Sequence, residues 1–170
     1  IGMGAFQYCE NLKSITIPDS VTSIGNYAFQ YCNSLESIII PDSITSIGTV
    51  MFRNCENLTN VTIPDSVNFI SSDAFNGCIN LKYHEDDNKL YLGNEDNPYL
   101  VLVKVKDTSI TSCEINSKTK IILYNAFFYC ESLTSITIPD SVTSIGDGAF
   151  YECSNLESIT IPDSVTSIGE

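Results

Sequence analysis

A four-residue phrase recurs along this chain and restricts its fold more than any other feature. Ile17-Pro18-Asp19-Ser20 returns in four further places, in steps of 23 residues on either side of a central interruption. Leucine, isoleucine, phenylalanine and cysteine columns keep the same step. Units of this length expose a hydrophobic face until a neighbour covers it. The sequence therefore predicts a repeat solenoid built from stacked coils.

One period shows how a coil is expected to form. Ser14–Ile17 ends in alternating polar and β-branched residues, which predicts a short strand with Ile15 and Ile17 inward. Pro18 ends the strand because proline has no amide donor for a ladder. Tyr27–Cys32 is too short for an independent helix and is predicted to be a short helical turn. We expect about seven such coils in a right-handed, mainly β solenoid.

The middle of the chain interrupts the repeat. Leu81 and Ile110 hold equivalent positions but are 29 residues apart, six more than one period. His84 and Asp86 fall where core isoleucines belong, so the first strand of this unit is expected to be broken or displaced. Two strand-like runs around a Gly-Asn-Glu-Asp-Asn-Pro stretch predict a β-hairpin at about Leu90–Lys106. We therefore expect one domain over residues 1–170, with an irregular segment at 83–109.

Composition excludes several classes of function. The chain has 21 acidic and 8 basic residues, for a net charge of -13. This charge argues against binding to nucleic acid or to an anionic membrane surface. No apolar run reaches the length of a membrane span. With one histidine and no tryptophan, the chain offers little for catalytic triads or zinc sites, and we expect neither an enzyme nor a cofactor.

The repeat unit Leu-x-x-Ile-x-Ile-Pro-x-Ser-Val-x-x-Ile-Gly-x-x-Ala-Phe-x-x-Cys resembles the BspA-like (Treponema pallidum type) leucine-rich repeat, over nearly the whole chain. The resemblance implies a curved solenoid with a parallel sheet on its concave side. It also implies a cell-surface or secreted protein that adheres to host matrix or cell-surface proteins. The chain begins and ends within repeat units, so we expect it to be a fragment of a longer array.

The predicted concave strands give a candidate binding face of mostly uncharged residues. Such a face suits a protein or glycan ligand bound by many modest hydrogen bonds, although threonine is also simply a good strand residue. The face comprises Ser14, Thr16, Ser37, Ile39, Asn60, Thr62, Ser112, Glu114, Ser135, Thr137, Ser158 and Thr160.

Two further columns have a structural and a functional interpretation. The turn aspartates are expected to stack about 5 Å apart, where they either accept local backbone hydrogen bonds or bridge Ca²⁺ weakly. Six cysteines share one repeat position, and we predict that they are reduced and buried. The aspartates are Asp19, Asp42, Asp65, Asp140 and Asp163. The cysteines are Cys9, Cys32, Cys55, Cys78, Cys130 and Cys153.

The irregular segment supplies the second set of candidate binding residues, because loops that break a regular scaffold tend to carry recognition. Its acidic clusters match no zinc or EF-hand spacing, and a solvated acidic loop is the simpler interpretation. Non-enzymatic adhesion is thus the predicted function, and a structural spacer without a ligand site is the alternative. The candidate residues are His84, Asp86, Tyr91, Glu95, Asp96 and Tyr99.

Overall fold

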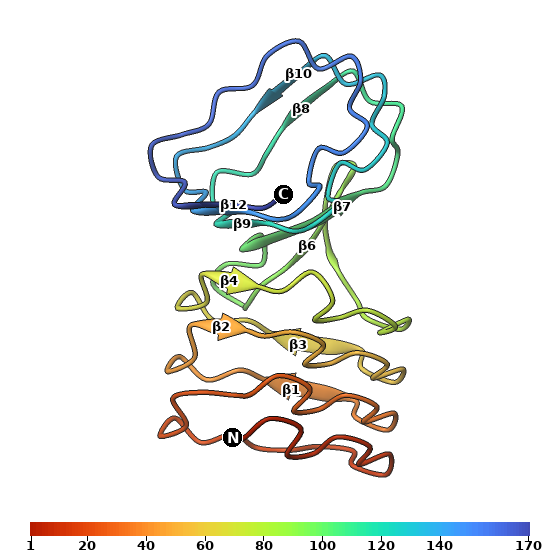
Figure 1. The fold of residues 1–170 in the computed structure, drawn as a ribbon, viewed down its shortest axis with the longest axis vertical. Coiled ribbons are helices and arrows are strands. Elements are labelled where there is room, and N and C mark those ends of the chain that lie inside the picture. Colours follow the sequence, from red (N-terminus) through yellow and green to blue (C-terminus); the bar gives the residue numbers. More distant parts are fainter. The chain divides into compact units, whose positions relative to one another are not determined.

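A computed structural model describes all 170 residues and shows a β-solenoid without helices (Figure 1). About six turns are formed, against the seven predicted. The chain divides into two compact units, unit 1 (residues 1–82 and 93–96) and unit 2 (residues 83–92 and 97–170). The strands are β1 (Ser37–Ile39), β2 (Ser46–Ile47), β3 (Asn60–Thr62), β4 (Phe69–Ile70), β5 (His84–Asp86), β6 (Lys89–Leu92), β7 (Val101–Val105), β8 (Ser112–Glu114), β9 (Ile121–Ile122), β10 (Ser135–Thr137), β11 (Ser144–Ile145) and β12 (Ser167–Ile168).

Parallel pairing at the repeat spacing builds each unit. In unit 1, β1 pairs with β3 so that Ser37 faces Asn60, and β2 pairs with β4. In unit 2, β8 pairs with β10 in the equivalent register. The predicted concave strands at 37–40, 60–63, 112–115 and 135–138 each form a strand that is one residue shorter, because the last residue, an isoleucine, already leads into the following turn. The parallel ladder is confirmed.

Two predicted strands are absent. Residues Ser14–Ile17 and Ser158–Ile161 have no strand assignment, so the prediction was wrong for these segments. Both lack the consecutive ladder hydrogen bonds that define a strand. Ser14–Ile17 is flanked by one bond, from the Glu36 amide to the Lys13 carbonyl at 3.1 Å. Both segments keep their places in the coils, but neither forms a complete strand ladder with its neighbour.

The Ala-Phe segment is a series of tight turns rather than the predicted helical turn. Tyr27 and Tyr31 have left-handed φ values of 62° and 59°, which an α-helix does not contain. Alternate amides bond to the next coil instead of continuing a helix. Tyr27 donates to the Thr49 carbonyl at 3.1 Å and Phe29 donates to the Met51 carbonyl at 3.0 Å. Coil-to-coil bonding therefore replaces helical bonding at this corner.

The central interruption forms the predicted hairpin. β6 pairs with β7 in antiparallel fashion, with a register shift between Leu90 and Tyr91. The displaced segment β5 also pairs antiparallel with β6, placing His84 opposite Tyr91. The three strands join β9, β11 and β12 in a six-stranded sheet with the order β12-β11-β9-β7-β6-β5. The first strand of this repeat is thus intact but has left the parallel ladder.

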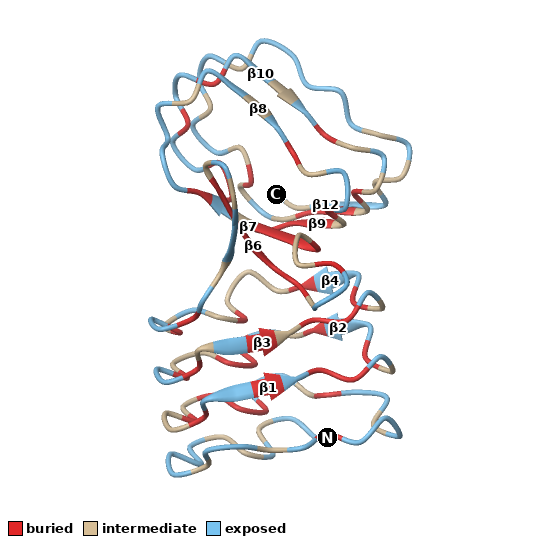
Figure 2. Ribbon diagram, turned by 180° about the vertical axis from the view of Figure 1, so that it is seen from behind, coloured by how far each residue is buried: buried red, intermediate tan, exposed pale blue.

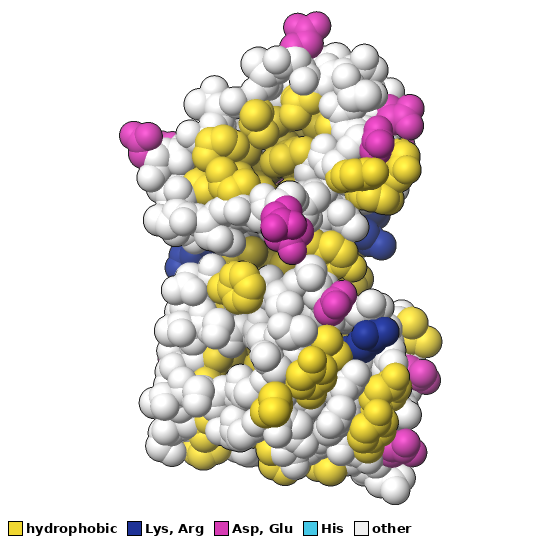
Figure 3. Space-filling view, in the orientation of Figure 1, with side chains coloured by type: hydrophobic (Ala, Val, Ile, Leu, Met, Phe, Trp, Pro, Cys, Tyr) yellow, Lys and Arg dark blue, Asp and Glu magenta, His cyan; other side chains and the backbone are white.

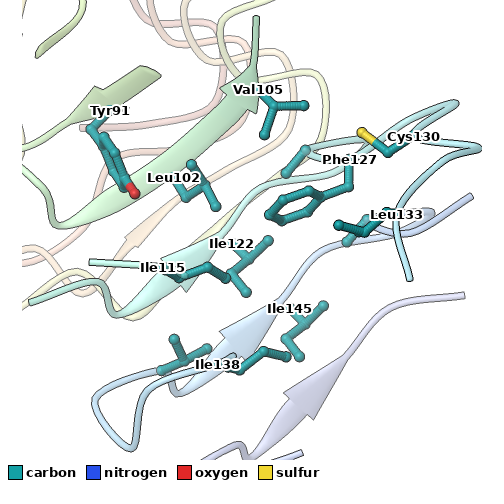
Figure 4. Close-up of a cluster of buried hydrophobic side chains, with 13 residues drawn as sticks. Tyr91, Leu102, Val105, Ile115, Ile122, Phe127, Cys130, Leu133, Ile138 and Ile145 are labelled. Atoms are coloured by element: carbon teal, nitrogen blue, oxygen red, sulfur yellow. The ribbon is translucent and has the colours of Figure 1, made fainter. Parts of the chain in front are cut away.

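Each unit has an apolar interior built from buried residues. Figure 2 marks where the buried residues lie along the coils. In unit 1, four phenylalanine rings stack one per coil, with centroid distances of 5.4, 5.6 and 5.5 Å. In unit 2, hairpin residues such as Tyr91 and Leu102 pack with repeat residues such as Phe127 and Ile145 (Figure 4). The stacked rings are Phe6, Phe29, Phe52 and Phe75.

The cysteine column lies beside the phenylalanine column and contains no disulfide. Four of the six thiols, those of Cys32, Cys55, Cys78 and Cys153, donate hydrogen bonds to phenylalanine carbonyls on a neighbouring coil; Cys55 Sγ, for example, lies 3.1 Å from Phe29 O. Cys32, Cys55, Cys78 and Cys130 are buried and Cys153 is half-buried, but Cys9 is exposed, which departs from the predicted uniform burial. A small apolar side chain with a weak donor fits this position.

We expect Phe52→Ala to lower the free energy of unfolding by about 3–5 kcal/mol, because the ring is fully buried between two other rings. Chemical denaturation monitored by circular dichroism measures the change. Phe69→Ala is the matched control, since Phe69 is exposed, and it should cost far less. Equal losses for both variants would contradict the importance of the stack.

Alkylation of the native chain should modify Cys9 rapidly and the buried thiols slowly. Burial raises the pKa of Cys32 to about 12 and that of Cys130 to about 11. A raised pKa keeps these thiols protonated and poorly nucleophilic near neutral pH, so their labelling should increase only as pH rises toward those values. Mass spectrometry of iodoacetamide-treated protein provides the measurement. Rapid labelling of most of the seven cysteines would contradict the buried column.

Candidate functional site

The structure places the predicted binding-face residues on the outward sides of the coils. Along β1, Ser37 and Ile39 are exposed while Ile38 is buried between them, and β3 alternates in the same sense. The face residues of β8 and β10 are also exposed. Ser14, Thr16, Ser158 and Thr160 are exposed too, although their segments are not strands.

A pocket of about 560 Å³ in unit 1 joins both sets of candidate residues. Ile39 and Thr62 come from the strand face, and Glu95 and Asp96 come from the irregular segment. Aspartates of the repeat turns complete its rim. We refer to this site as the acidic pocket. Its lining residues are Asp19, Ile39, Ile40, Pro41, Asp42, Thr62, Pro64, Asp65, Asn94, Glu95 and Asp96.

Asn94 attaches the irregular loop to the repeat coil. Its Nδ2 donates to the Ile63 carbonyl at 2.9 Å and to Asp65 Oδ1 at 3.4 Å. Its Oδ1 accepts the Asp96 amide at 3.0 Å, which closes an Asx turn. The Ile63 amide donates in turn to the Gly93 carbonyl at 3.0 Å. Both ends of one amide side chain thus fix the wall of the pocket.

The sequence pattern does not distinguish Asn94 as a functional residue. The signal available was an Asn-Glu-Asp run directly after Gly93, which is typical of an Asx turn. Its partners lie about 30 positions earlier and follow no repeat spacing. The contact between the loop and the coil could therefore be identified only from the structure.

The rim of the pocket is strongly acidic. Five carboxylates line it, and no lysine or arginine does. The turns themselves are closed by the backbone, because the Ile44 amide donates to the Pro41 carbonyl at 3.0 Å and the Val67 amide donates to the Pro64 carbonyl at 3.1 Å. The carboxylate of Asp42 is therefore not needed to hold its turn. The rim attracts cationic groups.

The aspartate column does not gather into a metal site. No group of three histidine, cysteine, aspartate or glutamate side chains is close enough to hold one ion. The other interpretation of this column was that aspartate side chains accept the turn amides. The turns are closed by backbone carbonyls instead. Adjacent carboxylates instead line one surface of unit 1.

Ile39 gives the pocket an apolar contact point. Its side chain is 68% exposed, and the same repeat position is threonine in the coils of Thr16, Thr62, Thr137 and Thr160. Exposed isoleucine at a position that is threonine in four other coils provides apolar area that a partner can bury. The pocket therefore suits a ligand with both basic and apolar side chains.

The remaining candidates of the irregular segment belong to unit 2. His84 is exposed on β5, and Asp86 Oδ2 accepts a hydrogen bond from Asn116 Nδ2 at 3.1 Å. Tyr91 is fully buried, and burial raises the pKa of its hydroxyl. Its ring contacts half-buried Tyr99 edge-on at 5.4 Å. Tyr91 is a core residue and does not contribute to a binding surface.

The surface agrees with the overall charge of the chain. On the face shown in Figure 3, acidic side chains are spread over both units and basic side chains are few. Hydrophobic side chains form separate patches between polar or backbone atoms. The structure has no helix with the length and apolar character of a membrane span.

Comparison with solved structures finds several leucine-rich proteins that are similar to this chain. A leucine-rich repeat protein from Bacteroides ovatus ATCC 8483 is 29% identical, with 99% of this chain and 48% of that chain covered and a TM-score of 0.51. A leucine rich cell surface protein from Faecalibacterium prausnitzii A2-165 is 26% identical, covering 99% and 58%, with a TM-score of 0.47. The T. pallidum leucine-rich repeat protein is 22% identical, covering 90% and 67%, with a TM-score of 0.43.

This chain spans about half the length of the Bacteroides ovatus protein. No curated protein sequence matches it. The model of the BspA type leucine rich repeat region matches residues 1–94 and 105–170 in six copies. The two matched ranges stop and resume within the β6–β7 hairpin, where the repeat is interrupted. The chain belongs to the BspA-type leucine-rich repeat family.

Proposed function

We propose that this chain is a non-enzymatic protein-binding module that acts in adhesion at a microbial cell surface, with the acidic pocket as its binding site. The observation that supports this most directly is the docking of the irregular loop onto the strand face, which brings Glu95 and Asp96 beside Ile39. Membership of a BspA-type family supports the surface location. A host matrix or cell-surface protein is the proposed partner class.

The chemistry of the pocket favours a basic protein surface over a glycan. Five carboxylates increase the rate of encounter with a cationic partner. Ile39 and the neighbouring prolines supply apolar contact area once the partner has arrived. No aromatic ring lines the pocket, so it lacks the flat apolar faces that large aromatic side chains bring to an interface.

A non-catalytic role is part of what we propose, and the arrangement of the titratable groups supports it. The single histidine, His84, is exposed on β5 in unit 2 and has no hydrogen-bonded carboxylate. The carboxylates of the acidic pocket are open to solvent. General acid-base catalysis requires groups that are positioned and tuned by their surroundings.

The binding test uses surface plasmon resonance with immobilised host extracellular matrix. We expect Asp42→Asn, Asp65→Asn and Asp96→Asn together to weaken binding about tenfold, because three exposed charges at about 0.5 kcal/mol each sum to about 1.5 kcal/mol, and a tenfold change in affinity corresponds to about 1.4 kcal/mol. Binding of the parent chain should also weaken with added salt. Ile39→Thr restores the repeat residue and should weaken binding with little salt dependence.

Asp140→Asn with Asp163→Asn is the matched control, since both residues hold the same turn position in unit 2. This variant should bind like the parent. If it loses as much affinity as the pocket variant, net charge and not the pocket determines binding. If the parent itself does not bind, the spacer interpretation replaces the proposed one.

Asn94→Ala should loosen the pocket wall without unfolding unit 1. It removes the bonds to Ile63 and to the Asp96 amide, and we expect a loss of about 1–2 kcal/mol in stability. Hydrogen exchange of the Asp96 amide should become faster, and matrix binding should weaken. Asn68→Ala, at an exposed position of unit 1, is the control. Unchanged exchange at Asp96 would show that Asn94 does not hold the loop.

A further inference from the structure

Strand β8 of unit 2 has a partner on only one side. It pairs with β10, and its two-stranded sheet contains no other strand. The Ile115 amide donates to the Thr137 carbonyl at 3.2 Å on the β10 side. Because successive residues of a strand point their backbone groups to opposite sides, the N–H and C=O groups of Ser112 and Glu114 point away from β10.

This edge is unpaired because the preceding repeat left the ladder. In unit 1, the equivalent edge of β3 is covered by β1 of the preceding coil. The strand that precedes β8 in the repeat order is β5, and β5 pairs with β6 instead. A position for one parallel strand beside β8 is therefore unoccupied within unit 2.

A pocket of about 550 Å³ lies along the same edge. One wall is β8 and its continuation to Ser117, and the other wall is the turn Asp86–Lys89. Asn88 holds this turn, because its Nδ2 donates to the Asp107 carbonyl and its Oδ1 accepts the Asp107 amide, both at 2.8 Å. The pocket is thus a cleft between two ordered backbone segments.

The charges of the cleft indicate what it accepts. Asp86, Asp87 and Glu114 line it, and Lys89 is the one basic side chain in the lining. The side chain of Lys89 is 9% exposed and its Nζ lies 3.7 Å from Asp87 Oδ2. The charge of Lys89 is therefore largely compensated by Asp87. The remaining charge of the cleft is negative and complements lysine or arginine side chains.

We propose that the edge of β8 binds an extended, basic segment of a partner protein by strand addition. The backbone groups of Ser112 and Glu114 pair with the added strand, and the carboxylates of the cleft pair with its basic side chains. A second copy of this chain is disfavoured, because two such edges would bring like-charged carboxylates together. This site lies in unit 2 and is separate from the acidic pocket.

The experiment measures fluorescence anisotropy of a short labelled peptide of alternating lysine and valine. All proteins carry the three substitutions of the acidic pocket, so failure of that pocket does not affect the result. Glu114→Pro removes the outward amide donor while leaving the β10 side intact, and should weaken binding about tenfold. Glu114→Gln removes only the charge and should have a smaller effect. Thr16→Pro is the matched control at the same repeat position in unit 1 and should bind like the parent.

Amide hydrogen exchange distinguishes strand addition from simple charge attraction. The peptide should slow exchange at Ser112 and Glu114, but not at Cys113, whose amide faces β10. A peptide of equal charge in which proline replaces the central valine should bind weakly. Equal binding by Glu114→Pro, or by the proline peptide, would overturn the proposal. A dimer that forms without peptide and is lost in Glu114→Pro would assign the edge to self-association instead.

Discussion

Hydrogen bonding between consecutive coils is the interaction on which the rest of the structure depends. Backbone amides at the corners, thiols of the cysteine column and hydroxyls of the Pro-Asp-Ser turns all donate to carbonyls of a neighbouring coil. Ser66 Oγ, for example, lies 2.8 Å from the Ile44 carbonyl. Because each donor must meet a carbonyl on the neighbouring coil, the regular coils on either side of the interruption keep a period of 23 residues. The same spacing brings the phenylalanine rings into a stack.

The repeat made most of the fold predictable. Alternation and proline positions located β1, β3 and β10, the repeat spacing counted back from Ala126-Phe127 located β8, and the failed pattern at His84 and Asp86 located the interruption. The helical turn at Tyr27–Cys32 was mispredicted because the sequence of one coil does not reveal bonds to the next. Those bonds hold residues such as Tyr27 at a φ of 62°, a conformation that local propensity disfavours for a bulky residue.

The candidate sites were only partly predictable, for a related reason. Sequence alternation identified Ile39 and Thr62 as outward residues, and composition identified Glu95 and Asp96 as loop residues. Their convergence depends on Asn94, whose partners follow no repeat. Tyr91 shows the opposite case, since an aromatic residue in an irregular segment proved to be fully buried. Residues outside a repeat have no column of equivalents from which their burial can be inferred.

The corner at the Ala-Phe segment, where residues have left-handed φ values, also bears on which substitutions such an array can tolerate. Gly4, Tyr27, Val50, Asn125 and Gly148 all occupy this corner with positive φ. Such different side chains share one backbone conformation because neighbouring coils, and not the side chain, hold it in place. Substitutions at the corner are therefore expected to accumulate without a shift in register. The corner can therefore vary in side chain while the stacked apolar interior keeps its packing.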